Sequence, residues 1–445
     1  MLDALFRTDA VREIFSDRAR LQGMLDFEAA LARATARAGL IPDTAVAQIE
    51  SQCRAELFDI ETLARGAEQA GNPAIPMVKA LTTLVEGRNR EAARYVHWGA
   101  TSQDAMDTGL VLQLRGALDI VEADLARLSA SLVKLARKHR RTPAAGRTWL
   151  QQAAPLTFGL KVAGWLSAIG RHQQRIRELR SRALVLQFGG ATGTLAATGS
   201  RGLDVASALA ADLKLDQPDL PWHAHRDRVA EVATTLGLLV GSLGKMARDV
   251  SLSMQTEIGE VFEPAAAGRG GSSSMPHKRN PVSAAVVLAA ATRVPALVSV
   301  MLSAMVQEHE RGLGNWHAEW ETLPEICMLS AGALAHMADV VEGLEVDAAR
   351  MRENLDVTRG LILAEAVSVA LAPKIGKAPA HQLVEDACRQ AVEQHQHLRD
   401  VLGKDARITA HLSAADLDRL FDPENYLGLA EQLVDRVLAA HAGKK

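Results

Sequence analysis

Two long runs of apolar residues at helical spacing organise the middle of the chain. The first run extends from about Asp107 to His139 and consists of Leu110, Leu114, Leu118, Val121, Leu125, Leu128, Leu132 and Leu135. The second run consists of Val229, Val232, Leu236, Leu239, Leu243, Met246 and Val250. Steps of three and four residues keep one apolar seam on one side of an α-helix, and no proline interrupts either run. At about 1.5 Å per residue the first helix would be close to 50 Å long, so we expect a long helical bundle.

Shorter helices flank this centre on both sides. Residues 21–38 place four apolar side chains on one side of a helix, Gly39 supplies a C-cap, and Pro42 prevents continuation. Beyond about residue 350 we expect short helices broken by prolines and a glycine, namely Pro373, Gly376, Pro379 and Pro423. The chain therefore divides into an N-terminal helical domain (1–106), a central long-helix bundle (107–350) and a small C-terminal helical domain (351–445).

Three segments interrupt or resemble this helical pattern. Residues 140–160 are rich in Pro, Gly and Gln and predict a loop followed by a helix, and residues 187–201 predict a glycine-dense bend. Val282 to Val306 is very apolar and about the length of a membrane span. Arg293 and Pro295 lie in its middle, and an apolar helix is also what the centre of a large bundle requires. We therefore expect a core helix of the bundle there.

Composition supports an all-α enzyme of the cytoplasm. Aromatic residues make up 4% of the chain, and few β-branched alternations occur. With 50 basic and 53 acidic side chains and a formal net charge of −3, there is no basic excess for nucleic acid or a membrane surface. Three scattered cysteines form neither a metal pattern nor a disulfide framework, which favours a reducing compartment. The N-terminus has no basic segment followed by an apolar one, so we expect no signal peptide.

The strongest candidate for chemistry is the Gly/Ser-rich segment 268–281, which contains Ser272, Ser273, Lys278 and Asn280. Its glycines let the backbone close over a ligand, and its serines supply hydroxyl groups. A helix begins near Pro281, and backbone N–H groups at a helix start favour an anion. A flexible linker is the common alternative for such runs, but this run continues into an ordered segment and the most apolar helix. We therefore expect a carboxylate site.

Two further segments offer hydrogen-bond donors. In residues 97–108, Thr101 and Ser102 can donate to a carboxylate and His97 can add charge, although the same residues also fit an N-cap of the first long helix. In residues 146–154, Arg147, Thr148 and Gln151 are polar groups in a loop that enters a helix, which by itself is uninformative.

Together and in this order, the three segments resemble the fumarase/aspartase superfamily over nearly the whole chain. The superfamily signature Gly-Ser-x-x-Met-x-x-Lys-x-Asn is matched by Gly271, Ser272, Met275, Lys278 and Asn280. The resemblance implies a three-domain, all-α fold and a homotetramer with a twenty-helix core, in which three subunits form each active site. It also implies β-elimination or its reverse without cofactor or metal, through an aci-carboxylate intermediate, with Ser272 as the acid/base.

Two departures from the superfamily pattern are informative. Trp149 stands where most members have His, and Ala285 stands where most have Glu. That pair transfers a proton to or from the reacting heteroatom, which an amine or water needs. A carboxylate does not need it, because its pKa of about 4 leaves it ionised at neutral pH. The absence of the His–Glu pair suits a substrate whose own carboxylate adds to its own double bond. Within the superfamily, the chain therefore resembles the cycloisomerase branch most.

The chain resembles that branch, the bacterial carboxymuconate cycloisomerases of protocatechuate breakdown, in four further runs: 15–22, 146–152, 307–311 and 316–320. The resemblance implies that Thr101, Ser102, Lys278 and Asn280 stabilise an enediolate. Arg311 or Arg147 would clamp the extra carboxylate of a tricarboxylate substrate, and either can instead be a structural ion-pair arginine. His97 would be a carboxylate ligand or a helix cap, and Trp149 would shape the pocket. Thr148, Gln151, Ser273 and Met275 complete the expected substrate-binding set.

Two alternatives stay open. An adenylosuccinate- or argininosuccinate-type lyase would be expected to carry His at position 149 and Glu at position 285. An inactive family member with a structural role is opposed by the intact Ser272, Lys278 and Asn280.

Overall fold

The computed structural model describes residues 2–265, 270–271, 274–275 and 277–442 of the 445-residue chain. Helices form most of the regular structure in this part of the chain, which confirms the all-α prediction, and the strands form two antiparallel pairs. The fold separates into two compact units. The first comprises Met1–Ala126, Arg171–Gly244 and Val286–His336, and the second comprises Arg127–Gly170, Lys245–Ala285 and Met337–Lys445. The three-domain division at residues 106 and 350 stays a prediction.

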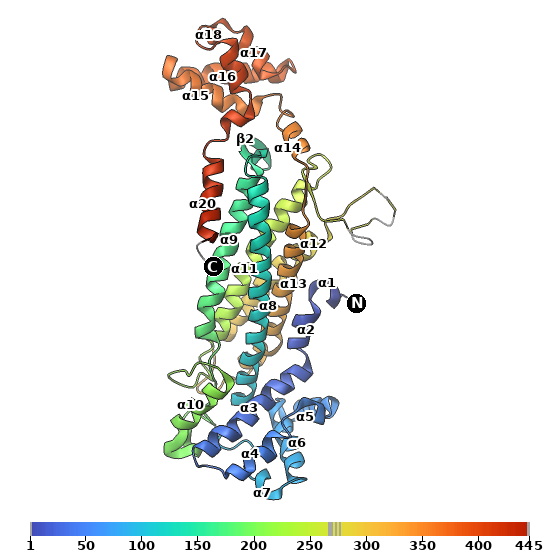
Figure 1. The fold of residues 1–445 in the computed structure, drawn as a ribbon, viewed down its shortest axis with the longest axis vertical. Coiled ribbons are helices and arrows are strands. Elements are labelled where there is room, and N and C mark those ends of the chain that lie inside the picture. Colours follow the sequence, from blue (N-terminus) through green and yellow to red (C-terminus); the bar gives the residue numbers. More distant parts are fainter. Residues whose placement is uncertain (1, 266–269, 272–273, 276, 443–445) are drawn as a thin grey trace. The chain divides into compact units, whose positions relative to one another are not determined.

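Five long helices each contribute residues to both units (Figure 1): α8 (Ser102–Lys138), α9 (Phe158–Ala183), α11 (Asp227–Ser253), α12 (Val282–Ala304) and α13 (Asn315–Glu342). The two predicted long helices are therefore confirmed as α8 and α11. All seven seam residues of α11 are buried, and so are those of α8 from Leu114 to Leu135. Burial of these seams is the main stabilising contribution available to helices of this length.

The first unit also contains the N-terminal helices, and those of residues 17–93 lie around the beginning of α8 (Figure 1). Its shorter elements are α1 (Asp3–Phe6), α2 (Asp9–Ile14), α3 (Asp17–Arg37), α4 (Asp43–Glu50), η1 (Ala55–Leu57), α5 (Ile60–Ala70), α6 (Ala74–Glu86), α7 (Arg90–Ala93), η2 (Ala196–Arg201) and α10 (Gly202–Leu213). Helix α3 ends as predicted, with Gly39 at φ 71° just beyond it. Its Gly23 faces Gly109 of α8, and a Cβ atom on Gly23 would lie 2.9 Å from the Gly109 carbonyl oxygen. The two helices therefore cross in close contact because both positions lack a side chain.

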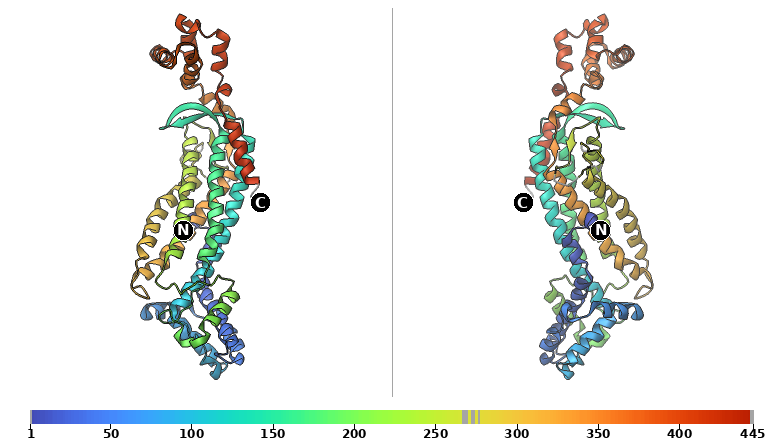
Figure 2. Two further views of the ribbon diagram at one scale, coloured as in Figure 1. Left: turned by 90° about the vertical axis from the view of Figure 1, so that its left-hand side faces the viewer. Right: turned by 90° about the vertical axis from the view of Figure 1, so that its right-hand side faces the viewer.

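The second unit contains a β-hairpin where the sequence predicted a loop. Strand β1 (Pro143–Thr148) pairs antiparallel with β2 (Gln151–Thr157), and Figure 2 shows the pair as a curved ribbon. The Pro- and Gly-rich composition predicts chain reversal correctly but gives no signal for the backbone pairing, which is irregular between Ala145 and Gly146. Helix α9 follows directly at Phe158, so the helix expected after this segment is confirmed.

Short helices form the rest of the second unit, as predicted. Its remaining elements are β3 (Val261–Phe262), β4 (Glu345–Val346), α14 (Ala348–Asn354), η3 (Leu361–Leu363), α15 (Ala364–Ile375), α16 (Lys377–Glu393), α17 (Leu398–Lys404), α18 (Ala406–Thr409), α19 (Ala414–Leu420), η4 (Pro423–Tyr426) and α20 (Ala430–Ala442). Gly376, at φ 92°, separates α15 from α16. Pro373 lies inside α15 and does not break it, and Pro379 lies in the first turn of α16, where a missing N–H is tolerated.

Helix α12 is less covered than the sequence predicted. By length and composition both α11 and α12 match a membrane span, a property that core helices of soluble proteins share. In α11, 61% of the most apolar 18-residue window is buried, whereas in α12 only 28% of the corresponding window is buried. Val300 and Leu302 are 40% and 48% exposed. A single chain therefore leaves much of this predicted core helix uncovered.

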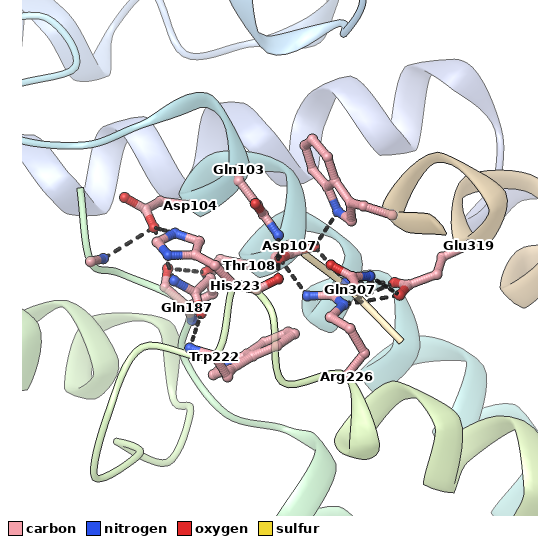
Figure 3. A network of polar contacts seen from close by, with 12 residues as sticks. Gln103, Asp104, Asp107, Thr108, Gln187, Trp222, His223, Arg226, Gln307 and Glu319 are labelled. Atoms are coloured by element: carbon pink, nitrogen blue, oxygen red, sulfur yellow. Dashed lines mark hydrogen bonds and ion pairs between the residues drawn. The ribbon is translucent and has the colours of Figure 1, made fainter. Parts of the chain in front are cut away.

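A buried ion cluster fixes the first unit around Arg226, whose side chain is 1% exposed (Figure 3). Its guanidinium donates to both oxygens of Asp107 on α8, at 2.7 and 3.0 Å, and to both oxygens of Glu319 on α13, at 2.6 to 3.1 Å. The indole of Trp222 lies 4.9 Å from the guanidinium carbon. One cation directly before α11 therefore joins α8 to α13.

The charges in this cluster are not balanced, since two carboxylates share one guanidinium. Burial opposes the charge of Arg226, but Asp107 and Glu319 outweigh it and raise the pKa of Arg226. Burial also raises the pKa of Glu319, and Asp107 adds to this effect while Arg226 opposes it. Further hydrogen bonds reach the carboxylates from Gln307 (3.1 Å) and Trp316 (3.3 Å). Such satisfaction of the remaining lone pairs is what a buried ion cluster requires.

We predict that Arg226→Met lowers the free energy of unfolding by about 3–5 kcal/mol near pH 7, because two buried carboxylates lose their cation. The variant has no cation to lower the pKa of Glu319, so this pKa rises further above its ordinary value of 4.5. The stabilising contribution of an acid with a raised pKa is present below its ordinary pKa and is lost as the pH rises through the folded-state value. Urea unfolding should therefore show a smaller deficit near pH 5 than near pH 7.

The matched control is Arg182→Met, which removes a half-exposed arginine that pairs with Glu231 in the same unit. Surface ion pairs contribute little, so this variant should unfold almost as the parent does. Equal destabilisation of the two variants, or a deficit that does not change with pH, would contradict the role given to Arg226.

Candidate active site

The segment that precedes α8 is held by one buried carboxylate, Asp104. It accepts hydrogen bonds from the backbone N–H groups of Thr101 (3.0 Å), Gly189 (3.0 Å) and Gly190 (2.9 Å). Gln187 and His223 also contact it, at 3.1 and 2.7 Å. The Thr101 contact has the geometry of an N-terminal cap, so the capping interpretation of this segment is correct for Asp104. The same contacts hold residues 187–190, the beginning of the glycine-dense bend, to Asp104, and Figure 3 shows Gln187 and His223 beside this carboxylate.

Arg311 reaches this segment from the chain between α12 and α13. Its terminal nitrogen donates to the Thr101 hydroxyl at 3.2 Å and to the Ala191 carbonyl at 3.0 Å. Its Nε is buried and has no hydrogen-bond partner. Among the described residues, no carboxylate lies within ion-pair distance of Arg311. An arginine with a free donor and no counter-ion is chemically suited to bind an anionic ligand.

His97 lies four residues before Thr101 and contacts a buried carboxylate. Its Nδ1 lies 2.6 Å from Oε1 of Glu28 on α3, and its backbone has φ 61°. A helix cap would accept a hydrogen bond from a backbone N–H group of α8. The His97 side chain contacts Glu28 instead, so it is not the helix cap. Burial favours the neutral imidazole, but Glu28 and Asp104 outweigh this effect and raise the pKa of His97 above 6.5.

Arg147, on β1 of the second unit, is already paired. Its two terminal nitrogens donate to the two oxygens of Glu260 at 2.9 and 2.5 Å, and the Glu260 side chain is 3% exposed. Asn354 also donates to Glu260, at 2.8 Å. Two arginines were expected as candidates to bind the extra carboxylate. Arg147 has an internal counter-ion in Glu260, whereas Arg311 has none among the described residues.

The tip of the β1–β2 hairpin carries two exposed apolar side chains. Trp149 is 97% exposed and Leu150 is 84% exposed. Both have positive φ, 54° and 65°, and they connect the paired residues Thr148 and Gln151. Two-residue turns of this kind favour Asn and Gly, because other side chains are strained in the left-handed region. Trp149 therefore shapes no pocket within its own unit.

The signature segment is described in part. Asn280 donates from its backbone to the Gly270 carbonyl at 2.8 Å and from its side chain to the Gly271 carbonyl at 3.4 Å. Met275 is 44% exposed, and the Lys278 side chain is also exposed. Ser272 and Ser273, the predicted acid/base and its neighbour, lie outside the described residues.

The beginning of α12 is not free to bind a substrate anion, contrary to the prediction. The carboxylate of Glu263, which is buried, accepts hydrogen bonds from the backbone N–H groups of Ser283 (3.1 Å) and Ala284 (2.7 Å). An internal carboxylate thus already satisfies the donors that made this helix start attractive. Ala285, in the place of the usual Glu, is exposed.

The structure thus brings some predicted residues together in each unit. In the first unit, Thr101 contacts Arg311, and His97 and Ser102 belong to the same segment. The second unit contains the predicted residues Arg147, Thr148, Trp149, Gln151, Met275, Lys278 and Asn280. Sequence reasoning missed Glu28, Glu260 and Glu263 as partners, and no local spacing indicates them. It also gave no role to Asp104, which lies within the segment 97–108.

Comparison with known proteins places this arrangement in a family. Residues 5–296 match a family model described as "Lyase", and residues 360–437 match one described as "Adenylosuccinate lyase C-terminus". The chain belongs to this lyase family. A 3-carboxy-cis,cis-muconate cycloisomerase of Pseudomonas aeruginosa is 64% identical over 99% of this chain and 96% of that protein.

Solved structures agree with this relationship. The 3-carboxy-cis,cis-muconate lactonizing enzyme of Pseudomonas putida has a TM-score of 0.95 and 59% identity, covering 100% of this chain and 99% of that one. The β-carboxy-cis,cis-muconate cycloisomerase of Acinetobacter calcoaceticus has a TM-score of 0.94 and 47% identity, covering 99% of both chains. The predicted superfamily, its cycloisomerase branch and its all-α type of fold are therefore confirmed.

We predict that Leu150→Gly strengthens the hairpin, because it removes a strained side chain at φ 65° that makes no buried contact in its unit. A gain of about 1 kcal/mol, the cost of one left-handed residue, would slow amide hydrogen exchange of β1 and β2 about fivefold. Leu220→Gly is the control, because it removes a similarly exposed leucine (76%) at a position without positive φ. Exchange that is unchanged or faster in Leu150→Gly would show that the turn is unstrained.

Proposed function

We propose that this protein interconverts 3-carboxy-cis,cis-muconate and 4-carboxymuconolactone, in protocatechuate breakdown in the cytoplasm. High identity to enzymes of this name over nearly the whole chain supports the proposal. The observation that carries it is the pair Trp149 and Ala285, which replaces the proton-transferring His and Glu of other lyases. Ring closure by an ionised carboxylate needs no such pair, whereas expulsion of an amine does.

Substrate binding requires cations for a triply charged molecule. Arg311 supports this role because its Nε has no partner and no described carboxylate neutralises it. Arg147 suits a structural role, since Glu260 occupies both of its terminal nitrogens. We therefore assign the clamp for the extra carboxylate to Arg311, with Thr101 beside it. A guanidinium binds a carboxylate through two parallel hydrogen bonds, which fixes its orientation.

Ring closure then moves charge from one carboxylate to another. An oxygen of the attacking carboxylate forms a bond to the alkene carbon, and the alkene electrons move into the neighbouring carboxylate as an enediolate. Thr101, Ser102, Lys278 and Asn280 would stabilise this charge as preorganised donors. Ser272 would deliver a proton to carbon, which collapses the enediolate to the lactone, and would remove that proton in the reverse direction. These steps form one carbon–oxygen bond and transfer one proton without net oxidation or reduction, so the reaction needs no redox cofactor.

Assembly as a homotetramer completes the proposal. Val300 and Leu302 of α12, in the first unit, are large apolar side chains left exposed by a single chain, and in the second unit Trp149 and Leu150 are 97% and 84% exposed. Exposed apolar area of this kind is typical of subunit interfaces. Each active site would take its three segments from three chains, so that the segment of Thr101 and the segment of Lys278 come from different subunits.

An adenylosuccinate-type lyase is the rival function, and the match of residues 360–437 to an adenylosuccinate lyase C-terminus is the observation in its favour. The absorbance of the conjugated diene decides between the two. The proposed function is upheld if 3-carboxymuconate loses its absorbance while adenylosuccinate and argininosuccinate do not react. The reverse result would replace it.

We predict that Ser272→Ala abolishes lactonisation, since the variant lacks the proton donor, and that it sediments as a tetramer like the parent. Ultraviolet absorbance measures the reaction, and analytical ultracentrifugation measures the assembly. Ser181→Ala, which removes a hydroxyl on the exposed side of α9, is the control and should keep full activity. An active Ser272→Ala enzyme would remove the assigned acid/base.

We predict that Arg311→Lys raises KM for 3-carboxymuconate about 10- to 100-fold, because lysine cannot form the two parallel hydrogen bonds. Steady-state kinetics measure this change. The comparison variant is Arg147→Lys, in which we expect a lower melting temperature and a smaller change in KM, because Glu260 is its partner. A larger rise of KM in Arg147→Lys than in Arg311→Lys would reverse the assignment.

A further inference from the structure

A buried carboxylate on α3, Glu28, has one recorded polar contact among the described residues. Its side chain is 0% exposed, and its Oε1 lies 2.6 Å from Nδ1 of His97. Its second oxygen, Oε2, is buried and has no hydrogen-bond partner. An ionised carboxylate in such surroundings is costly unless a cation compensates it. The contact with His97 is therefore what allows an acidic side chain to be retained at this position.

Other nearby groups do not supply that charge. The thiol of Cys53 is buried, and burial together with the Glu28 carboxylate raises its pKa, so it stays neutral. The position of Glu28 follows from the packing of α3, whose Gly23 lets it cross α8 in close contact. This crossing holds a carboxylate directly behind the segment that contains His97, Thr101 and Ser102.

The geometry of His97 leaves one ring nitrogen for a ligand. Nδ1 faces Glu28, whereas Nε2 has no hydrogen bond among the described residues, and 17% of the side chain is exposed. The charged groups that act on the ring are Glu28 of α3 and Asp104 of α8, and both favour the imidazolium against the effect of burial. The backbone at φ 61° is an uncommon conformation for histidine, as expected where the surrounding structure dictates the position of a side chain.

We propose that Glu28 is a positioning residue, which orients His97 through Nδ1 and keeps it cationic so that Nε2–H donates to a carboxylate of the substrate. This inference rests on the proposed function for the identity of the substrate. The pair supplies a charged donor without adding net charge to the site. It also leaves Arg311 as the uncompensated cation for the extra carboxylate.

The test is Glu28→Gln, which removes the charge and keeps the volume. We expect KM for 3-carboxymuconate to rise about tenfold, the size of one lost charged hydrogen bond, with a smaller change in kcat. Burial is then opposed by Asp104 alone, so the pKa of His97 falls below its value in the parent and the high-pH limb of kcat/KM should move to lower pH. The control is Asp26→Asn, which makes the same charge change at an exposed position of α3. It should change neither KM nor the high-pH limb of kcat/KM.

A double-mutant cycle separates positioning from a merely structural role. If Glu28 acts through His97, Glu28→Gln changes KM little in a His97→Asn background, whereas additive effects of the two changes would overturn the proposal. An unmoved high-pH limb in Glu28→Gln would overturn it as well. If Glu28→Gln does not fold, Glu28→Asp keeps the charge at a longer distance and should retain the parental pH limb, and loss of that limb contradicts the proposal.

Binding of tricarballylate, an unreactive tricarboxylate, tests the pair independently of turnover. Calorimetry at pH 6 and pH 8 should show weaker binding to Glu28→Gln than to the parent wherever the parent keeps the His97 proton and the variant has lost it, because the pKa of His97 is lower in the variant. A parent enzyme that binds tricarballylate but does not convert 3-carboxymuconate would sink the proposed function and leave this inference intact. Equal binding by both proteins at both pH values would sink the inference alone.

Discussion

The first unit depends on one fully buried cation. Arg226 must be neutralised in place, and the two carboxylates that do so belong to α8 and α13, so neither helix can shift without separating opposite charges in an apolar interior. The donors on Gln307 and Trp316 satisfy remaining oxygens of the same cluster. Asp107 of this cluster lies one helical turn after Asp104 on α8, and Asp104 holds the segment that contains Thr101. The ion cluster therefore fixes the same part of α8 that holds the candidate site.

A consistent electrostatic pattern distinguishes structural from ligand-binding groups. Arg226 and Arg147 each face buried carboxylates, and the Glu263 carboxylate faces the N–H groups that begin α12. Arg311 breaks this pattern, since it is partly buried and has no described carboxylate beside it. Since the other two arginines named here have carboxylate partners, the absence of a described carboxylate beside Arg311 makes it a candidate to bind an anion from outside.

Much of the fold followed from the sequence because helical periodicity is a local property. The seams of α8 and α11 and the end of α3 at Gly39 could all be predicted from neighbouring residues. The hairpin at 143–157 could not, because its pairing depends on a register that composition does not encode. The ion partners were equally hidden, since Arg226 lies 93 residues from Glu319 and His97 lies 69 residues from Glu28. For the site, the signature indicated candidate segments, but it did not show which of the two arginines has a carboxylate partner within the chain.

The exposed tip of the β1–β2 hairpin links the conformation of a single chain to its association with other chains. Two large apolar side chains stand in water on a left-handed turn, and both features raise the free energy of an isolated chain. A contact that covers Trp149 and Leu150 recovers the hydration part of that cost, so folding of this element and association are thermodynamically linked. If chains assemble as proposed, a newly made chain is least stable before it associates, and the level of expression becomes a determinant of how much native enzyme a cell contains.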